Sequence, residues 1–179
     1  MADETPTGNI NVFVPGLKLV PQATGNICWW AAALMMYNWK VARGGKVPHP
    51  DDEPKNKSRR LSDCILPWDE IPAFADSVGM VARPLISPTP EMLASWLRQG
   101  PMWTDGVFVD PQGRTLPSGH MTVLAGLRSV PSSDGYEVFL YDPDPPRRGS
   151  AQWRPISQLV SIMGAGAYAA VPCNFLYYQ

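Results

Sequence analysis

The chain has 179 residues, of which 45% are hydrophobic, and it carries 15 Lys and Arg against 16 Asp and Glu. This length and hydrophobic content fit a single globular domain over residues 1–179 with a sizeable core. The formal net charge of −1 gives no electrostatic basis for nucleic acid or a membrane as a partner. The three cysteines form no C-x-x-C pair and the sequence has 2 histidines, so neither a metal nor another cofactor is expected.

The first helix of the chain is predicted close to its start. Residues 1–9 are expected to form a loose N-terminus and residues 10–19 a short strand or extended arm. Asn26 has the side chain of an N-cap for a helix over 28–41, whose alanine-rich sequence is apolar nearly all round and should therefore be buried. The longest apolar stretch, 27–37, is 11 residues long, which is too short to cross a bilayer.

A charged segment follows this predicted helix. Residues 43–63 are rich in charge and interrupted by prolines, which predicts a long charged surface loop. His49 lies within it between two prolines, so its side chain is expected to be solvated. Beyond the segment, amphipathic helices are predicted over 69–78 and 89–99, with a strand over 80–86 between them.

The second half of the chain predicts a sheet. Strands are expected over 102–109, 120–127 and 136–141, followed by a short helix over 156–163 and a last strand over 167–171. Helices that come mainly before the strands indicate an α+β fold.

Cys28 is the residue that points most directly to chemistry. It begins the predicted helix, where the helix dipole and free backbone N–H groups favour the nucleophilic thiolate. The alternative is a small buried hydrophobic residue, which is the usual role of a free cysteine. Gln22 precedes Cys28 by six positions across a glycine-containing loop. Its amide, together with the backbone N–H of Cys28, could stabilise a tetrahedral oxyanion.

A base and its orienting group are predicted on the strands. His120 opens an apolar strand after a glycine, so a rigid element can hold its ring against Cys28, although it could also be a satisfied core histidine. Asp142 ends the next strand and, because consecutive antiparallel strands are usually neighbours, can orient the histidine. Asp144 is the reserve candidate, and an Asp-Pro turn without a catalytic role is the alternative.

Three segments together resemble the papain-like cysteine peptidases. They run from Gln22 to Ala32, from Ser118 to Val123 and from Tyr141 to Pro143. Two features, the Gly-His before an apolar strand and the Asp-Pro in place of the papain Asn, resemble the sequences of two bacterial branches of these peptidases. These are the double-glycine peptidase domains that trim bacteriocin leaders and the papain-like effector proteases that bacteria inject into other cells.

The resemblance implies a fold and a set of roles. A central nucleophile helix would pack on an antiparallel sheet, with Cys28 as nucleophile, His120 as base, Asp142 as orienting group and Gln22 as oxyanion donor. Gly25 stands where papain has a disulfide-bonded cysteine, and the segment 43–63 has no counterpart. The chain carries no transporter domain, which argues against leader processing and favours a stand-alone enzyme such as an injected effector or toxin.

Hydrolysis of peptide bonds through a Cys28 thioester is therefore the leading hypothesis. The alternatives are an amidase acting on peptidoglycan or side-chain amides and a catalytically silent papain-like binding module. The expected partners are a protein or peptide substrate and a cognate immunity or inhibitor protein. The acidic start lacks the pattern of a secretory signal, so synthesis in the cytoplasm and export by a specialised secretion system are expected. A disulfide between Cys64 and Cys173 remains open.

Overall fold

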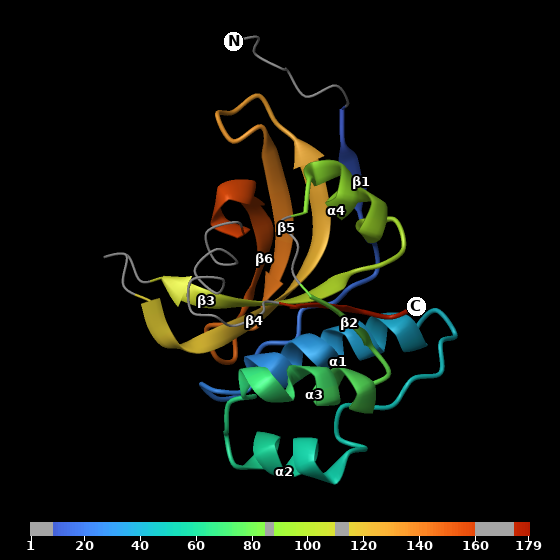
Figure 1. Cartoon of the computed structure of the whole chain (residues 1–179), viewed down its shortest axis with the longest axis vertical. Coiled ribbons are helices and arrows are strands. Elements are labelled where there is room, and N and C mark those ends of the chain that lie inside the picture. The colour runs from blue at the N-terminus through green and yellow to red at the C-terminus, as the bar shows by residue number, and fades with distance from the viewer. Residues whose placement is uncertain (1–8, 85–87, 110–114, 160–173) are drawn as a thin grey trace.

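The computed structural model describes residues 9–84, 88–109, 115–159 and 174–179. Most of the helices precede most of the strands along these residues, which is an α+β arrangement (Figure 1). In chain order the elements are β1 Asn11–Phe13, α1 Cys28–Val41, α2 Pro54–Leu61, the 3-10 helix η1 Trp68–Glu70, α3 Ile71–Ser77, β2 Val81–Pro84, α4 Pro90–Leu97, β3 Met102–Val109, β4 Thr115–Ser129, β5 Tyr136–Asp142, β6 Ser150–Pro155 and β7 Asn174–Tyr177.

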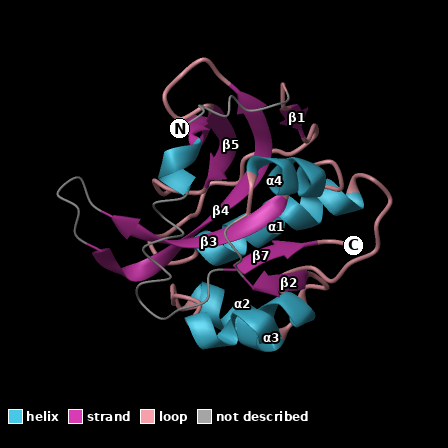
Figure 2. Cartoon of the chain, turned by 45° about the horizontal axis from the view of Figure 1, so that its top comes forward, coloured by secondary structure: helices cyan, strands magenta, loops and turns pink. Residues whose placement is uncertain are grey.

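The strands form one antiparallel sheet in the order β2-β7-β3-β4-β5-β6, with β1 paired to β4. The last strand, β7, therefore inserts between β2 and β3. Helix α1 lies against the sheet, and α3 and α2 lie beyond it on the same side (Figures 1 and 2). The predicted fold, a nucleophile helix packed on an antiparallel sheet, agrees with this arrangement.

Helix α1 is central because it is apolar on nearly every side. Its ends agree with the sequence prediction, and most of its side chains are buried: Cys28, Trp29, Ala31, Ala32, Ala33, Met35, Met36 and Trp39. On one side the Trp29 ring meets Phe74 of α3 edge to face, with ring centroids 5.3 Å apart. On the other side Trp103 of β3 donates its indole N–H to the Trp29 carbonyl at 3.2 Å. Burial of this helix on two sides holds its first residue firmly in place.

The predicted cap of α1 is wrong. Ile27 is the N-cap and makes no side-chain capping bond. Asn26 instead donates its side-chain amide to the Asp63 carbonyl at 3.0 Å, and its backbone N–H to the Asp63 carboxylate at 3.0 Å. Asn26 therefore hydrogen-bonds Asp63, which is 37 residues away in the chain, instead of capping the helix as the local sequence predicted. The first backbone N–H groups of α1 are consequently left uncapped by a side chain.

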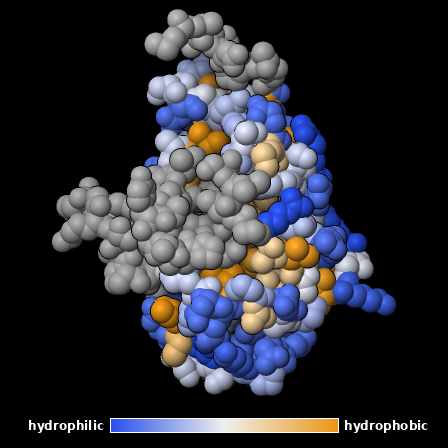
Figure 3. Space-filling view, in the orientation of Figure 1, coloured by the Kyte–Doolittle hydropathy of each residue, from blue (hydrophilic) through white to orange (hydrophobic). Residues whose placement is uncertain are grey.

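The segment 43–63 is not simply a loop, because it contains α2. Pro54 occupies the first turn of this helix, and the Glu53 side chain caps it. Asp51 fastens the segment to α1 by accepting hydrogen bonds from Trp30 at 2.8 Å and from Arg60 at 2.7 and 2.9 Å. The segment does lie at the surface, in the mainly hydrophilic lower part of Figure 3.

His49 is not simply solvated either. Its side chain is half-buried and its ring lies edge to face with that of Tyr37, with centroids 4.9 Å apart. The ring Nδ1 accepts a hydrogen bond from the backbone N–H of Asp51 at 3.0 Å. This histidine therefore supports the segment around α2.

The remaining elements differ from the prediction mainly in their ends. The helix expected over 69–78 is divided into η1 and α3, and β4 begins at Thr115 and so extends before His120. Strands β6 and β7 were not predicted. Residues 156–159 are helical as expected, whereas the rest of that predicted helix and the strand over 167–171 lie outside the described residues. None of the helices in the described ranges has the length and apolar character needed to traverse a bilayer.

Candidate active site

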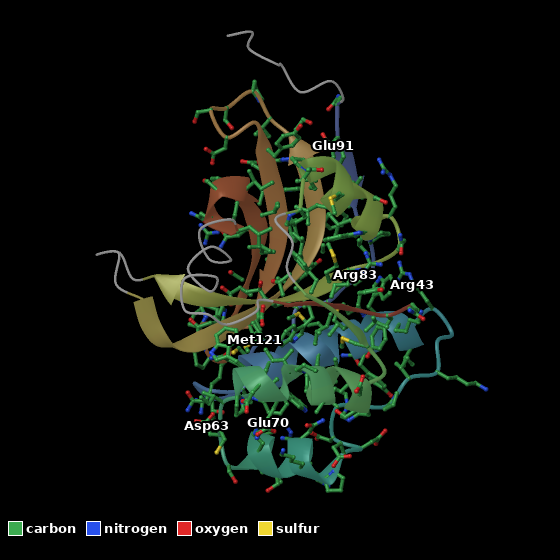
Figure 4. All side chains as sticks on the ribbon, viewed as in Figure 1. Arg43, Asp63, Glu70, Arg83, Glu91 and Met121 are labelled. Carbon is green, nitrogen blue, oxygen red and sulfur yellow. The ribbon has the colours of Figure 1, made fainter. Side chains whose placement is uncertain are left out.

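Cys28 is the first residue of α1 and lies between that helix and the sheet. Its side chain is buried, with 6% of the residue exposed, and its Sγ lies 3.6 Å from Sδ of Met121 on β4. Figure 4 labels Met121 in the region where β4 passes over α1. Because the helix N-terminus is uncapped by a side chain, backbone N–H groups remain next to the sulfur.

His120 and Asp142 meet on neighbouring strands. Nε2 of His120 on β4 lies 2.6 Å from Oδ1 of Asp142 at the end of β5. The antiparallel register pairs Val123 with Tyr141 and so places Asp142 opposite Thr122. His120 is two positions from Thr122, so it lies on the same face of the sheet as Asp142 and is its diagonal neighbour. The predicted contact between the two residues is therefore present, and Asp142 rather than Asp144 makes it.

The electrostatics of His120 favour its charged form. Burial alone would lower its pKa, but the hydrogen bonds to Asp142 and Cys28, together with their charges, raise the pKa from 6.5 to about 9. Because Nε2 is bonded to Asp142, the other ring nitrogen is left to interact with Cys28. The three side chains thus form a chain of thiol, imidazole and carboxylate.

Gly119, directly before His120, allows a tryptophan to approach the site. A Cβ atom at this position would lie 2.3 Å from the ring of Trp68, closer than two carbon atoms can come. Trp68 belongs to η1, which precedes α3, so the helical part of the molecule contacts the sheet beside His120. Nothing in the sequence around Gly119 indicated that Trp68 would pack against it.

Gln22 is buried, with 1% of the residue exposed, on the loop before α1. Its Nε2 donates to the Gly25 carbonyl at 3.2 Å and to Oδ1 of Asp144 at 3.0 Å. Its backbone N–H donates to the Pro143 carbonyl at 3.0 Å. Gln22 is therefore joined to the turn that follows Asp142, a contact over 122 positions that spacing along the chain could not reveal.

The other cysteines and histidine do not join this group in the described residues. Cys64 is exposed, whereas Cys173 lies outside the described ranges, so the disulfide that the sequence left open is not tested. His49 is engaged with Tyr37 and Asp51 as described above. Among the described residues, no cluster of three or more His, Cys, Asp or Glu side chains could hold a metal ion.

Comparison with known proteins agrees with the geometry. The model of one protein family, described as papain-like cysteine protease AvrRpt2, matches residues 10–155. That range covers most of the chain and includes Gln22, Cys28, His120 and Asp142. No curated protein matches the chain. On the strength of the family match, the chain belongs to this family of papain-like cysteine proteases.

Proposed function

We propose that the protein hydrolyses peptide bonds with Cys28 as nucleophile, His120 as general base and acid, and Asp142 as the group that orients the histidine. The observation that carries this proposal is the 2.6 Å contact between His120 Nε2 and Asp142 Oδ1, made by a ring that also hydrogen-bonds Cys28 at the start of α1. A nucleophile within reach of a base that a third group orients is the arrangement expected for acyl transfer.

In the first step, the Cys28 sulfur attacks the substrate carbonyl carbon and forms a carbon–sulfur bond. The carbonyl oxygen becomes an oxyanion, for which the backbone N–H of Cys28 and the Gln22 amide are the proposed donors. With its pKa raised to about 9, His120 is protonated at neutral pH. It gives this proton to the leaving nitrogen as the carbon–nitrogen bond breaks, leaving a Cys28 thioester and a new amino terminus.

In the second step, neutral His120 removes a proton from water, and the hydroxide oxygen adds to the thioester carbonyl. Collapse of this second tetrahedral species breaks the carbon–sulfur bond and releases the carboxylic acid. The proton taken from water remains on His120, opposite the sulfur, so the resting ion pair is restored. Asp142 keeps the ring in one orientation and balances its positive charge in both steps.

The biological setting is proposed from the sequence resemblance to injected effector proteases. We infer that the protein is made in the cytoplasm and delivered into another cell, where it acts as an effector or toxin on a protein substrate. A producing cell would then need an immunity or inhibitor protein if the enzyme could also act on its own proteins. Fusion to a reporter that is modified only inside a recipient cell would test delivery, and its absence from recipient cells would contradict this setting.

Hydrolysis is tested with a positional-scanning library of fluorogenic peptides, using wild type and Cys28→Ala. We expect cleavage that depends on Cys28, with new amino termini identified by mass spectrometry. Release of ammonia from glutamine side chains, or of fragments from peptidoglycan, without peptide cleavage would favour an amidase instead. A wild-type protein that hydrolyses none of these substrates would contradict the proposed reaction and favour a binding module.

A further inference from the structure

The turn after β5 holds the proposed oxyanion donor on both its backbone and its side chain. The Gln22 backbone N–H donates to the Pro143 carbonyl at 3.0 Å, and the Gln22 carbonyl accepts from the Arg147 N–H at 2.7 Å. Between these two bonds, the Gln22 amide nitrogen donates to the Asp144 carboxylate at 3.0 Å. Gln22 and the turn from Pro143 to Arg147 therefore form one hydrogen-bonded unit.

The orientation of the Gln22 amide depends on its two acceptors. Nε2 faces two oxygens, one from the Gly25 carbonyl and one from the Asp144 carboxylate. Rotating the amide by 180° would place Oε1 against both oxygens, which repel it. In the present orientation Oε1 is buried without a hydrogen-bond partner in the described part of the chain, so it does nothing to hold the amide. The two acceptors must do so.

Of the two acceptors, Asp144 forms the stronger hydrogen bond. A carboxylate accepts more strongly than a neutral carbonyl, and its distance of 3.0 Å is shorter than the 3.2 Å to Gly25. Gly25 also lies on an exposed loop, whereas Asp144 is only partly exposed. The hydrogen bond to Gly25 is therefore the one that can be given up to a developing oxyanion, when the whole amide turns about its remaining bond to Asp144.

Asp144 is also joined to the histidine side of the site. Its backbone N–H donates to Oδ1 of Asp142 at 2.9 Å, and this is the oxygen that meets Nε2 of His120. The backbone of Asp144 thus supports the orienting carboxylate, and its side chain supports the oxyanion donor. A substitution of the side chain retains the first contact and removes the second.

We propose that Asp144 is a positioning residue that acts through Gln22. Its carboxylate fixes one amide hydrogen so that the other can stabilise the oxyanion formed at Cys28. This inference rests on the proposed acyl-transfer function, because an oxyanion arises only when a carbonyl is attacked. It gives Asp144 a role different from that of Asp142, although the two residues are only two positions apart in the chain.

A double-mutant cycle tests this coupling, measured with the peptide that wild type cleaves best in the library. Gln22→Ala should lower kcat/KM by roughly 10²–10³, the usual cost of one oxyanion donor. Asp144→Ala should lower it by about 10- to 100-fold, because a misplaced group can cost about that much. The double variant should be no slower than Gln22→Ala alone, since Asp144 has nothing left to position.

Three controls separate positioning from other roles. Asp144→Asn should retain most of the activity, because an amide oxygen can still accept the Gln22 hydrogen. Alkylation of Cys28 by iodoacetamide and the pH profile of kcat/KM should be unchanged in Asp144→Ala, since neither depends on an oxyanion donor. Asp76→Ala, which removes an exposed carboxylate on α3, should match wild type.

The outcomes distinguish this inference from the proposed function. The inference would be overturned if the two losses multiply in the double variant or if Asp144→Ala hydrolyses the peptide at the wild-type rate. A shifted pH profile in Asp144→Ala would also overturn it, because it would indicate that Asp144 acts on His120. A wild-type rate in Gln22→Ala would overturn the oxyanion role of Gln22 and this inference with it. Hydrolysis that does not depend on Cys28 would instead contradict the proposed function itself.

Discussion

The contact between His120 and Asp142 gives a prediction that can be worked through from the structure. The pKa of His120 is raised from 6.5 to about 9, although burial alone would lower it. At 1.36 kcal/mol for each pKa unit, this difference favours the imidazolium by roughly 3 kcal/mol. Asp142→Asn keeps an oxygen that can accept from Nε2 but removes the negative charge. The pKa of His120 should therefore fall toward 6.5 in this variant, because burial is then opposed mainly by Cys28.

The assay is an NMR titration of the histidine rings between pH 5 and about 10.5. This range spans the pKa of His120 expected in wild type and the lower pKa expected in Asp142→Asn. The sequence has 2 histidines, so His120→Ala assigns the signals and His49 serves as an internal control. An unchanged His120 titration in Asp142→Asn would refute the assignment of the raised pKa to Asp142. A His120 pKa near 6.5 in wild type would refute the electrostatic basis of the site.

The same shift predicts how stability depends on pH. Because the pKa of His120 is higher in the folded protein than in the unfolded chain, its contribution to stability is fully present below about pH 6.5. This contribution is lost as the pH rises through about 9. Urea unfolding should show a smaller loss over this window for Asp142→Asn than for wild type. Equal losses in the two proteins would contradict this explanation.

Three further predictions concern other parts of the molecule. Iodoacetamide should label buried Cys28 faster than exposed Cys64 at neutral pH, because charged His120 favours the reactive sulfur; equal rates by mass spectrometry would contradict this. Gly119→Ala should destabilise the fold by about 1–3 kcal/mol through overpacking, and Trp68→Ala should relieve that loss because the new Cβ would lie 2.3 Å from its ring. Asp51→Asn should lower the free energy of unfolding by roughly 1–3 kcal/mol. Burial raises the pKa of Asp51, but the hydrogen bonds and charges of its partners lower it overall, so these partners stabilise the ionised carboxylate in the folded protein. The difference from wild type should vanish as the pH falls through that lowered pKa, and a difference that persists in acid unfolding curves would contradict the ion-pair explanation.

The sequence predicted those parts of the fold that depend on local pattern. Helix α1 has the predicted ends because its apolar, alanine-rich run begins and stops within a few residues. The predicted N-cap was wrong, because Asn26 hydrogen-bonds Asp63, a residue that only the fold brings close. Strand β6 is polar and mostly exposed or half-buried, and β7 is only four residues long, so neither has a strong alternating pattern. Long-range pairing, rather than propensity, decides such strands.

The sequence predicted which residues form the candidate site better than it predicted the contacts between them. Gln22 and Cys28 are near each other in the chain, and the pairing of β4 with β5 follows from their order. The sequence favoured Asp142 over Asp144 because Asp142 ends a predicted strand, but it assigned Asp144 no partner of its own. The structure separates them, with Asp142 at His120 and Asp144 at Gln22. Side-chain direction in a turn depends on backbone geometry that residue types alone do not specify.

The pairing of β4 with β5 also limits which changes of length the chain can tolerate. Val123 lies opposite Tyr141, and successive side chains on a strand point to opposite faces. One residue inserted between His120 and Val123 would turn the histidine away from Asp142 and leave the apolar pairs further along the ladder in place. Two inserted residues would return it to the correct face but displace it along the strand by roughly 7 Å. Either variant would keep the pairing of β4 with β5 from Val123 onward and still hold His120 away from Asp142, so the spacing of this short stretch matters as much as its residues.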